Sequence, residues 1–333
     1  MNSIFLLIKK QWFTIGLLAV IVLAVLFPGA ASLNEGGRLT STIVSLIFLA
    51  MGITLPTEVL ISGLSKWRIH LFIQSFIFIL IPGFFFISTW FFKGSISREI
   101  HIGLLALAVL PTTISTCSVF TLISRGDVVL TLFNASLSNT LGIVISPLLL
   151  SFFLREAGRS MPFSMLVDII TGLALIMLLP LVIGQIVRLA FRHRTKKLEQ
   201  RIGISSNLMI LSIVFFTLSK SAATPIFRQG FSSYLIPIVY LIIVHFIFIF
   251  AAVVCARKLN FTGPETISVL YAVPQKTLAM GVPLLSAYFA DDPTLLGIAL
   301  LPLLFYHPWQ LFIAGILKSL PIVKSWGAKQ KSA

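Results

Sequence analysis

The chain has 333 residues, of which 57% are hydrophobic and only 11% are charged. Soluble globular domains carry about 25% charged residues, so this chain has too few charges to cover a folded body in water. Its formal net charge is +15, but the basic residues stand in short clusters between apolar runs, which indicates a membrane protein and excludes nucleic acid as a partner.

Ten apolar stretches are long enough to cross a bilayer as helices, which takes about 20 residues. In chain order they are 11–34, 39–57, 71–92, 102–124, 128–154, 169–187, 202–219, 229–256, 266–290 and 293–317. A helix satisfies its own backbone in lipid, and these runs lack the alternation of barrel strands. The sequence therefore predicts an all-α integral membrane protein with ten transmembrane helices in the lipid bilayer.

The first stretch has a second interpretation. Lys9 and Lys10 precede it and Gly29-Ala30-Ala31-Ser32 lies near its end, as in a cleavable signal peptide. The apolar run is long for such a peptide, and its removal would leave nine stretches. We therefore expect a retained first helix.

Basic residues are unevenly divided between the two sides of the predicted membrane. Seventeen of the 25 fall at the N-terminus, in every second loop and in the C-terminal tail. The positive-inside rule then places both termini in the cytoplasm of a cell in whose inner or plasma membrane the chain resides. The longest basic connector, 188–201, is predicted to be a cytosolic loop at the headgroups that binds anionic lipid.

The fourth and ninth stretches share an internal break. Each has Ala-Val followed closely by a proline, Pro111 or Pro274, and proline interrupts a helix. Polar residues follow both prolines: Thr112, Thr113, Ser115, Thr116 and Ser118 in the first case, and Gln275, Lys276 and Thr277 in the second. Two simple kinks are the alternative, but matched polar breaks favour a substrate or ion site between two inverted five-helix repeats, 1–157 and 158–333.

Lys276 is the one charged residue inside the ten stretches, and none of them holds an Asp or Glu to pair with it. A charge at mid-membrane is expensive and is a functional candidate by default. Its ammonium group has three interpretations: a substitute for a sodium ion that neutralises an anionic substrate, a proton carrier, or a donor to carbonyls that holds the broken helices together. Its expected partners are carbonyls, the hydroxyls of Thr112, Thr113 and Ser115, or the substrate.

Other polar residues in the stretches are weaker candidates. Asn134, Ser138 and Asn139 share one helix face or its edge and either coordinate a ligand or bond neighbouring helices. Gln74, Tyr271 and His307 are further candidates, although a lone membrane histidine commonly serves packing. Cys117 and Cys255 have no metal-ligand spacing, and catalytic motifs are absent, so we expect no enzyme, metal site or bound cofactor.

Several segments carry a family resemblance. They are Gln11-Trp12-Phe13, His70-Leu71-Phe72-Ile73-Gln74, Phe133-Asn134, 141–149, 183–188, Gly281-Val282-Pro283-Leu284 and Tyr306-His307-Pro308. In their order and spacing the chain resembles the sodium/bile acid cotransporter family of the bile acid:sodium symporter superfamily, and within it the cotransporter-7-like branch.

This resemblance implies a panel domain of spans 1, 2, 6 and 7 and a core domain of spans 3–5 and 8–10, with the broken spans 4 and 9 crossing. It also implies alternating-access symport of a small organic anion, either bile-acid-like or steroid-conjugate-like, or another small carboxylate or sulfate. Sodium-coupled members carry Glu-x-Gly-x-Gln-Asn in the ninth span, where this chain has Tyr271 in place of the glutamate and Lys276 in place of the asparagine.

The usual two-sodium site is therefore not expected, and the coupling ion is left as sodium or a proton. A non-transporting membrane regulator or scaffold that keeps the fold is the alternative function. An intramembrane enzyme would need paired carboxylates that the spans lack. The sequence leaves the substrate, the stoichiometry and the oligomeric state open.

Overall fold

The computed structural model describes residues 12–30, 32, 38–55, 65–91, 94–156, 162–222, 232–289 and 292–328. The regular elements within these ranges are helices. Several positions used in the sequence predictions lie outside the described residues: Lys9, Lys10, Gln11, Ala31, Lys93, Arg159, Arg228, Lys329 and Lys331. The chain divides into two compact units, each described below by itself.

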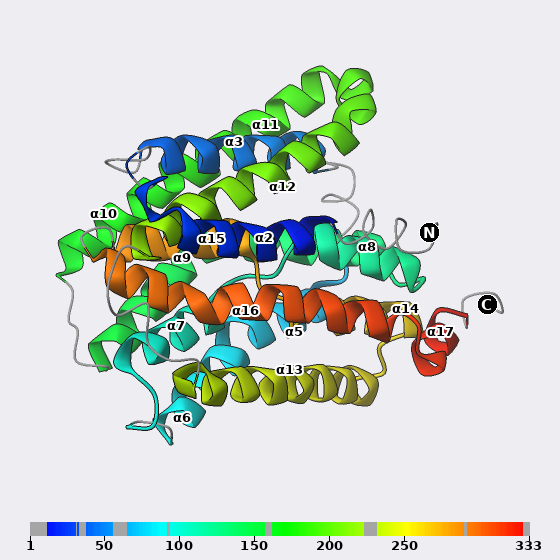
Figure 1. The fold of residues 1–333 in the computed structure, drawn as a ribbon. Coiled ribbons are helices and arrows are strands. Elements are labelled where there is room, and N and C mark those ends of the chain that lie inside the picture. The colour runs from blue at the N-terminus through cyan, green and yellow to red at the C-terminus, as the bar shows by residue number, and fades with distance from the viewer. Residues whose placement is uncertain are drawn as a thin grey trace, which may run out of the picture. The chain divides into compact units, whose positions relative to one another are not determined.

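The first unit comprises Met1–Leu55, Thr171–Gly230 and Val282–Leu300. Its main helices are α2 (Trp12–Leu26), α3 (Arg38–Thr54), α11 (Leu179–Ala190) and α12 (Arg192–Ala222). Helix α12 packs on α2 and α3, and α11 packs on α3 (Figure 1).

Helices α3 and α11 meet backbone to backbone. A Cβ atom on Gly52 would lie 2.2 Å from the carbonyl oxygen of Leu181, and one on Gly184 would lie 2.3 Å from that of Leu49. Only glycine permits this approach. The Gln185 side chain then donates to the carbonyls of Gly52 and Leu55 at 2.7 and 2.9 Å, which caps the end of α3.

The second unit comprises Pro56–Ile170, Phe231–Gly281 and Leu301–Ala333. Its helices are α5 (Trp67–Ser75), η2 (Phe76–Leu80), α6 (Ile81–Trp90), α7 (Arg98–Ala108), α8 (Ser115–Ile123), α9 (Val128–Glu156), α13 (Ser232–Lys258), α14 (Gly263–Ala272) and α17 (Pro321–Ala328). Three further helices run across the division between the units: α10 (Phe163–Leu173), α15 (Leu278–Tyr288) and α16 (Pro293–Leu317).

Two helical runs contain a five-residue π-helical segment, η2 in the second unit and η3 (Ala174–Leu178) in the first. Each segment lies just before a proline, Pro82 or Pro180. A proline supplies no N–H to the helix, and a wider turn before it shifts the hydrogen-bond register without ending the helix.

Six helical runs are long and apolar enough to cross a membrane, judged by length and composition. They are Trp67–Trp90, Val128–Arg155, Phe163–Ala190, Arg201–Ser219, Tyr234–Lys258 and Leu295–Leu317. The four other predicted spans correspond to α2 and α3, with 15 and 17 residues, and to the interrupted pairs α7/α8 and α14/α15. The structure is thus all-helical and rich in apolar runs, and the count of ten spans stays a prediction.

Two sequence predictions were wrong. The basic stretch 188–201 is not a loop: Arg188 belongs to α11, and residues 192–201 form the first turns of α12. Lys, Arg, Glu and Gln are good helix formers, so an apolar helix continues through such a stretch. The run predicted as 169–187 begins at Phe163, so it contains the exposed Asp168, a carboxylate that the prediction left outside every span.

Candidate functional site

The first helix break separates α7 from α8 within the second unit. Helix α7 ends at Ala108, and α8 begins at Ser115. Pro111 lies between them and has no backbone N–H to continue the helix. The carbonyls at the end of α7 therefore lack intrahelical donors and need other partners.

The second break separates α14 from α15. Thr262 and Glu265 form a capping box that starts α14, and this helix ends at Ala272, two residues before Pro274. Helix α15 begins at Leu278. Residues 273–277 are thus non-helical and mostly buried, with Gln275 and Lys276 only 1% and 2% exposed.

The two breaks contact each other directly. The backbone N–H of Thr277 donates to the carbonyl oxygen of Pro111 at 3.0 Å. The Gln275 Oε1 atom accepts from the hydroxyls of Thr113 and Thr116, both at 2.7 Å. These residues belong to the two polar clusters that the sequence identified, 159 to 162 positions apart in the chain.

Cys117 completes this junction. Its Sγ atom lies 3.2 Å from Gln275 Oε1 and 3.2 Å from the carbonyl oxygen of Tyr271, and it also contacts the hydroxyls of Thr112 and Thr113. Thr113 and Thr116 contact each other as well. A thiol that sequence reasoning left aside therefore links α8 to the end of α14.

Lys276 binds the end of helix α7. Its Nζ atom donates to the carbonyl oxygens of Ala108 and Leu110 at 2.8 and 2.7 Å. The C-terminal end of a helix carries partial negative charge, so these carbonyls form a cation site. Within the described part of the chain, no carboxylate lies within ion-pair distance of this ammonium group.

Helix α16 holds the second break from the other side. Tyr306 Oη donates to the carbonyl oxygen of Pro274 at 2.7 Å and contacts His245 Nδ1 at 2.8 Å. The Gln310 side chain bonds both the N–H and the carbonyl of Lys276, at 2.7 and 2.9 Å. His307 Nδ1 lies 3.4 Å from that same carbonyl.

Helix α9 does the same for the first break. Asn139 Nδ2 donates to the carbonyl oxygen of Thr112 at 2.8 Å, and Ser146 Oγ donates to that of Val109 at 2.7 Å. In each case, the uninterrupted helix that follows a broken pair supplies side-chain partners to the carbonyls of the break. Buried backbone groups in a membrane require such partners.

The remaining sequence candidates divide into two groups. Asn134 and Gln74 bond each other at 3.2 Å, and Asn134 also contacts His70 at 3.0 Å, in a separate cluster between α5 and α9. Tyr271 lies beside the junction, although its hydroxyl contacts Ser124 instead. Ser115, Ser118 and Ser138 do not join the junction: Ser115 is exposed, and the other two hydroxyls bond carbonyls of their own helices.

Three buried side-chain atoms in these clusters have no hydrogen-bond partner in the described structure: Gln74 Oε1, Asn139 Oδ1 and Gln275 Nε2. Buried polar atoms are normally bonded, so each is a candidate contact for a ligand or water. Among the described residues, no group of three His, Cys, Asp or Glu side chains could hold a metal ion.

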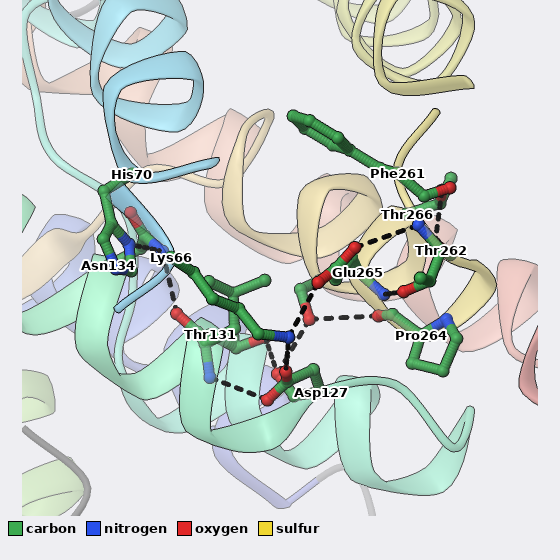
Figure 2. A network of polar contacts seen from close by, with 12 residues as sticks. Lys66, His70, Asp127, Thr131, Asn134, Phe261, Thr262, Pro264, Glu265 and Thr266 are labelled. Atoms are coloured by element: carbon green, nitrogen blue, oxygen red, sulfur yellow. Dashed lines mark hydrogen bonds and ion pairs between the residues drawn. The ribbon is translucent and has the colours of Figure 1, made fainter. Parts of the chain in front are cut away.

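A second polar cluster lies at the opposite end of α14 (Figure 2). Lys66 Nζ bonds Asp127 Oδ2 at 2.9 Å and Glu265 Oε1 at 2.7 Å. Asp127 also caps α9 through the N–H of Leu130. We call Lys66, Asp127 and Glu265 the ion triad; it joins the starts of α5, α9 and α14.

Charge pairing in the ion triad shifts two of its pKa values. Partial burial alone would raise the pKa of Glu265, but bonds from Lys66 and Thr262 lower it below its ordinary value. Burial would likewise lower the pKa of Lys66, but Glu265 and Asp127 raise it. The ion triad was not predicted, because its members lie at or near the starts of three different helices and carry no motif.

Sequence reasoning also missed Tyr306, Gln310 and Ser146 as side-chain partners of the breaks. These residues could have been recognised in the sequence as polar side chains, one amide and two hydroxyls, within strongly apolar runs.

An all-helical chain with several membrane-crossing runs and a buried polar junction between two broken helices belongs to the class of multi-pass membrane transporters. A profile of the SBF-like CPA transporter family matches residues 11–320. Sodium/bile acid cotransporter 7-B of Xenopus laevis is 31% identical over 98% of this chain and 95% of its own length. The rat sodium/bile acid cotransporter 7 is 30% identical over 96% and 94%, and the putative symporter YfeH of Escherichia coli (strain K12) is 29% identical over 92% and 91%.

The chain therefore belongs to the SBF-like CPA transporter family, a family of transporters and not of enzymes. The predicted resemblance to the bile acid:sodium symporter superfamily is confirmed.

Proposed function

We propose that this protein is a secondary active transporter that moves a small organic anion by alternating access, with Lys276 as a built-in cation in place of the usual two-sodium site. The names of the relatives, sodium/bile acid cotransporter and putative symporter, support a symporter for a solute of the bile-acid type. We extend the proposal to steroid conjugates and to other small carboxylates or sulfates. We further propose a cell-membrane location with both termini in the cytoplasm, as the distribution of basic residues predicts.

The architecture we propose has ten spans in two inverted repeats, 1–157 and 158–333. The support is the parallel between the breaks: α9 partners the α7/α8 break as α16 partners the α14/α15 break. The first compact unit also contains spans 1, 2, 6 and 7, the proposed panel. The later part of α15 and the first part of α16 depart from the proposed division into panel and core. The segment that contains them, Val282–Leu300, clusters with the first unit.

One observation carries the choice of an anion: Lys276 is 2% exposed, and its ammonium group has carbonyl partners but no carboxylate partner among the described residues. Removing a charge from water without a counter-charge costs several kcal/mol. An anionic substrate would supply that counter-charge. The third N–H of Lys276 and the unpartnered Nε2 of Gln275 are donors suited to it.

The same contacts argue for a sodium substitute. Carbonyls at a helix C-terminus are typical ligands of a coupling cation in transporters with broken helices. Here the Ala108 and Leu110 carbonyls already bind an ammonium group. Two of the three roles considered for Lys276 thus combine: it replaces a cation, and it holds the broken helices together.

The test is uptake of radiolabelled taurocholate, and of a steroid sulfate in a second series, into proteoliposomes with an imposed sodium, potassium or proton gradient. We expect saturable uptake by the wild type that does not require sodium, and loss of uptake in Lys276→Met. Lys324→Met, which removes an exposed lysine on α17, is the matched control and should transport normally.

Sodium-dependent uptake that survives in Lys276→Met would overturn the role of Lys276. Uptake that follows only the proton gradient and is lost in Lys276→Met would favour the proton carrier. If the folded wild type moves neither anion under any gradient, the protein is better explained as a non-transporting regulator.

A further inference from the structure

Three residues of α16 contact the second break. Tyr306, His307 and Gln310 occupy positions i, i+1 and i+4, so they lie on one side of the helix. All three are buried, at 2%, 5% and 1% exposure. Between them they bond the carbonyl of Pro274 and both backbone groups of Lys276.

The bond between Gln310 and Lys276 is two-sided. Gln310 Oε1 accepts from the Lys276 backbone N–H at 2.7 Å, and Gln310 Nε2 donates to the Lys276 carbonyl at 2.9 Å. A Gln amide combines a neutral donor and a neutral acceptor on one planar carbon, so it can bond a backbone N–H and a backbone carbonyl at once. The break after Pro274 leaves the Lys276 backbone outside any helix, and the Gln310 amide replaces the partners that a helix would have supplied.

The two backbone groups of Lys276 fix the orientation of this amide, because the N–H needs the amide oxygen and the carbonyl needs the amide nitrogen. Gln310 Nε2 has two hydrogens, and its second contact is His307 Nδ1 at 3.0 Å. With Nε2 as the donor, the ring nitrogen accepts. A flipped amide would lose both bonds to the Lys276 backbone.

Lys276 needs such support because its side chain is long and flexible. Holding a lysine side chain in one geometry costs about 2 kcal/mol of rotamer entropy. Its Nζ reaches the carbonyls of Ala108 and Leu110 only if the backbone of the break is fixed relative to α7. Gln310 holds the backbone of Lys276, and the bond from Thr277 to Pro111 holds the next residue of the break. Together these bonds fix the backbone from which the Lys276 side chain extends.

We propose that Gln310 is a positioning residue of the transport site: by holding both backbone groups of Lys276, it sets where the ammonium lies and hence the affinity for the anion, without touching the anion. This inference rests on the proposed function for its effect on transport, but its effect on the break stands independently. Tyr306 has a smaller part in the same task, through the carbonyl of Pro274.

The test compares Gln310→Met, which keeps the length of the side chain but removes its hydrogen bonds, with Gln185→Met. Gln185 is the matched control because its amide also bonds two backbone groups, the carbonyls of Gly52 and Leu55, within the other unit. Hydrogen–deuterium exchange of the peptide 269–278 in detergent reports on the break. Taurocholate uptake by proteoliposomes gives KM and the maximal rate separately.

For Gln310→Met we expect exchange in 269–278 to rise about tenfold and KM to rise about tenfold, as for the loss of a buried hydrogen-bond pair. Gln185→Met should leave both unchanged, even where it lowers the amount of folded protein. Tyr306→Phe removes only one hydroxyl and should raise both quantities by about threefold. If Gln310→Met does not fold, Tyr306→Phe tests whether the contacts from α16 hold the second break.

Unchanged exchange in Gln310→Met overturns the proposal, and so does raised exchange with an unchanged KM. If the wild type carries neither taurocholate nor the steroid sulfate, the proposed function has failed, and exchange alone decides whether Gln310 holds Lys276. The reference is then Lys276→Met, which keeps both hydrogen bonds between the Gln310 amide and the backbone of residue 276. Faster exchange of 269–278 in Gln310→Met than in Lys276→Met supports the role of Gln310 in holding the backbone of Lys276, and equal exchange rejects it.

Discussion

The backbone N–H of Thr277 donates a hydrogen bond to the carbonyl oxygen of Pro111, 3.0 Å away. The two residues are 166 positions apart, and each lies in the non-helical segment that interrupts its own pair of helices. The bond gives a backbone partner to a carbonyl that lies between α7 and α8 and outside both helices. Polar groups released by one break are thus satisfied by the other, which makes the junction a single structural unit.

Space for this junction comes from Gly142 on α9. A Cβ atom there would lie 3.1 Å from both Pro111 Cγ and Met280 Sδ. Gly142→Leu would push a branched side chain into both breaks, and we expect a loss of about 1–3 kcal/mol of stability. Thermal unfolding followed by tryptophan fluorescence measures it.

Gly172→Leu is the control, because a Cβ atom at Gly172 meets nothing within 4 Å. Equal melting temperatures for the two variants would show that Gly142 is not needed for close packing.

Lys276 occupies carbonyls that could otherwise bind a metal cation. In Lys276→Asn the Ala108 and Leu110 carbonyls lose their ammonium donor, and the asparagine oxygen adds a hard ligand. We expect sodium to stabilise this variant, by about 1.4 kcal/mol at ten times the dissociation constant, but not the wild type. Melting temperatures in sodium and in choline chloride at equal ionic strength measure the difference.

Sodium stabilisation of the wild type to the same extent would contradict the built-in cation. Lys276→Met tells whether loss of the charge alone is sufficient, since methionine adds no oxygen ligand.

The sequence predicted the breaks well because their cause is local. Pro111 and Pro274 lack a backbone N–H wherever they stand, and each is followed by polar residues that need partners. The partners themselves were predicted less well. Lys276 was expected to bond carbonyls, the hydroxyls of Thr112, Thr113 and Ser115, or the substrate; in the structure it bonds the carbonyls of Ala108 and Leu110. Backbone carbonyls are present at every residue, so no sequence pattern indicates which ones a side chain will reach.

Gln310 was missed for a related reason. A single glutamine in an apolar helix has no motif, and its partner Lys276 is 34 residues away. The basic stretch 188–201 was assigned to a loop because its charges mark the edge of a membrane span. Charge determines depth in the membrane, however, and does not end a helix, so α12 begins at Arg192.

Thr113, in the first break, and Thr116, in α8, act on Gln275 as a pair. Thr113 and Thr116 both donate to Gln275 Oε1 at 2.7 Å, with Cys117 Sγ at 3.2 Å. We expect Thr116→Val to cost about 0.5–1.5 kcal/mol, since valine keeps the shape and two donors remain. The double variant with Thr113→Val should cost more than the sum of the single changes, because Oε1 is then left nearly unpaired.

A double-mutant cycle on unfolding free energies measures this coupling. Strictly additive effects would mean that the two hydroxyls do not share the oxygen. Thr140→Val on α9, at an exposed position, is the reference for a threonine change outside the junction.

The ion triad predicts a pH dependence with a definite sign. The pKa of Glu265 is lowered from 4.5, because bonds from Lys66 and Thr262 outweigh its partial burial. Its contribution to stability is therefore present above pH 4.5 and is lost as the pH falls through the lowered value. The pKa of Lys66 is raised from 10.5 by its two carboxylate partners, against partial burial. Its contribution is full below pH 10.5 and is lost as the pH rises through the raised value.

Glu265→Gln isolates the acidic side of this dependence. The Lys66 side chain is 40% exposed, so we expect the substitution to cost no more than about 1 kcal/mol. The cost should be constant between about pH 5 and pH 10 and should shrink as the pH falls below 4.5, until the wild-type carboxylate also becomes neutral at its lowered pKa. Melting temperatures of the wild type and Glu265→Gln across pH 3.5–8 test this. A difference that grows as the pH falls would have the wrong sign for a carboxylate held ionised by Lys66.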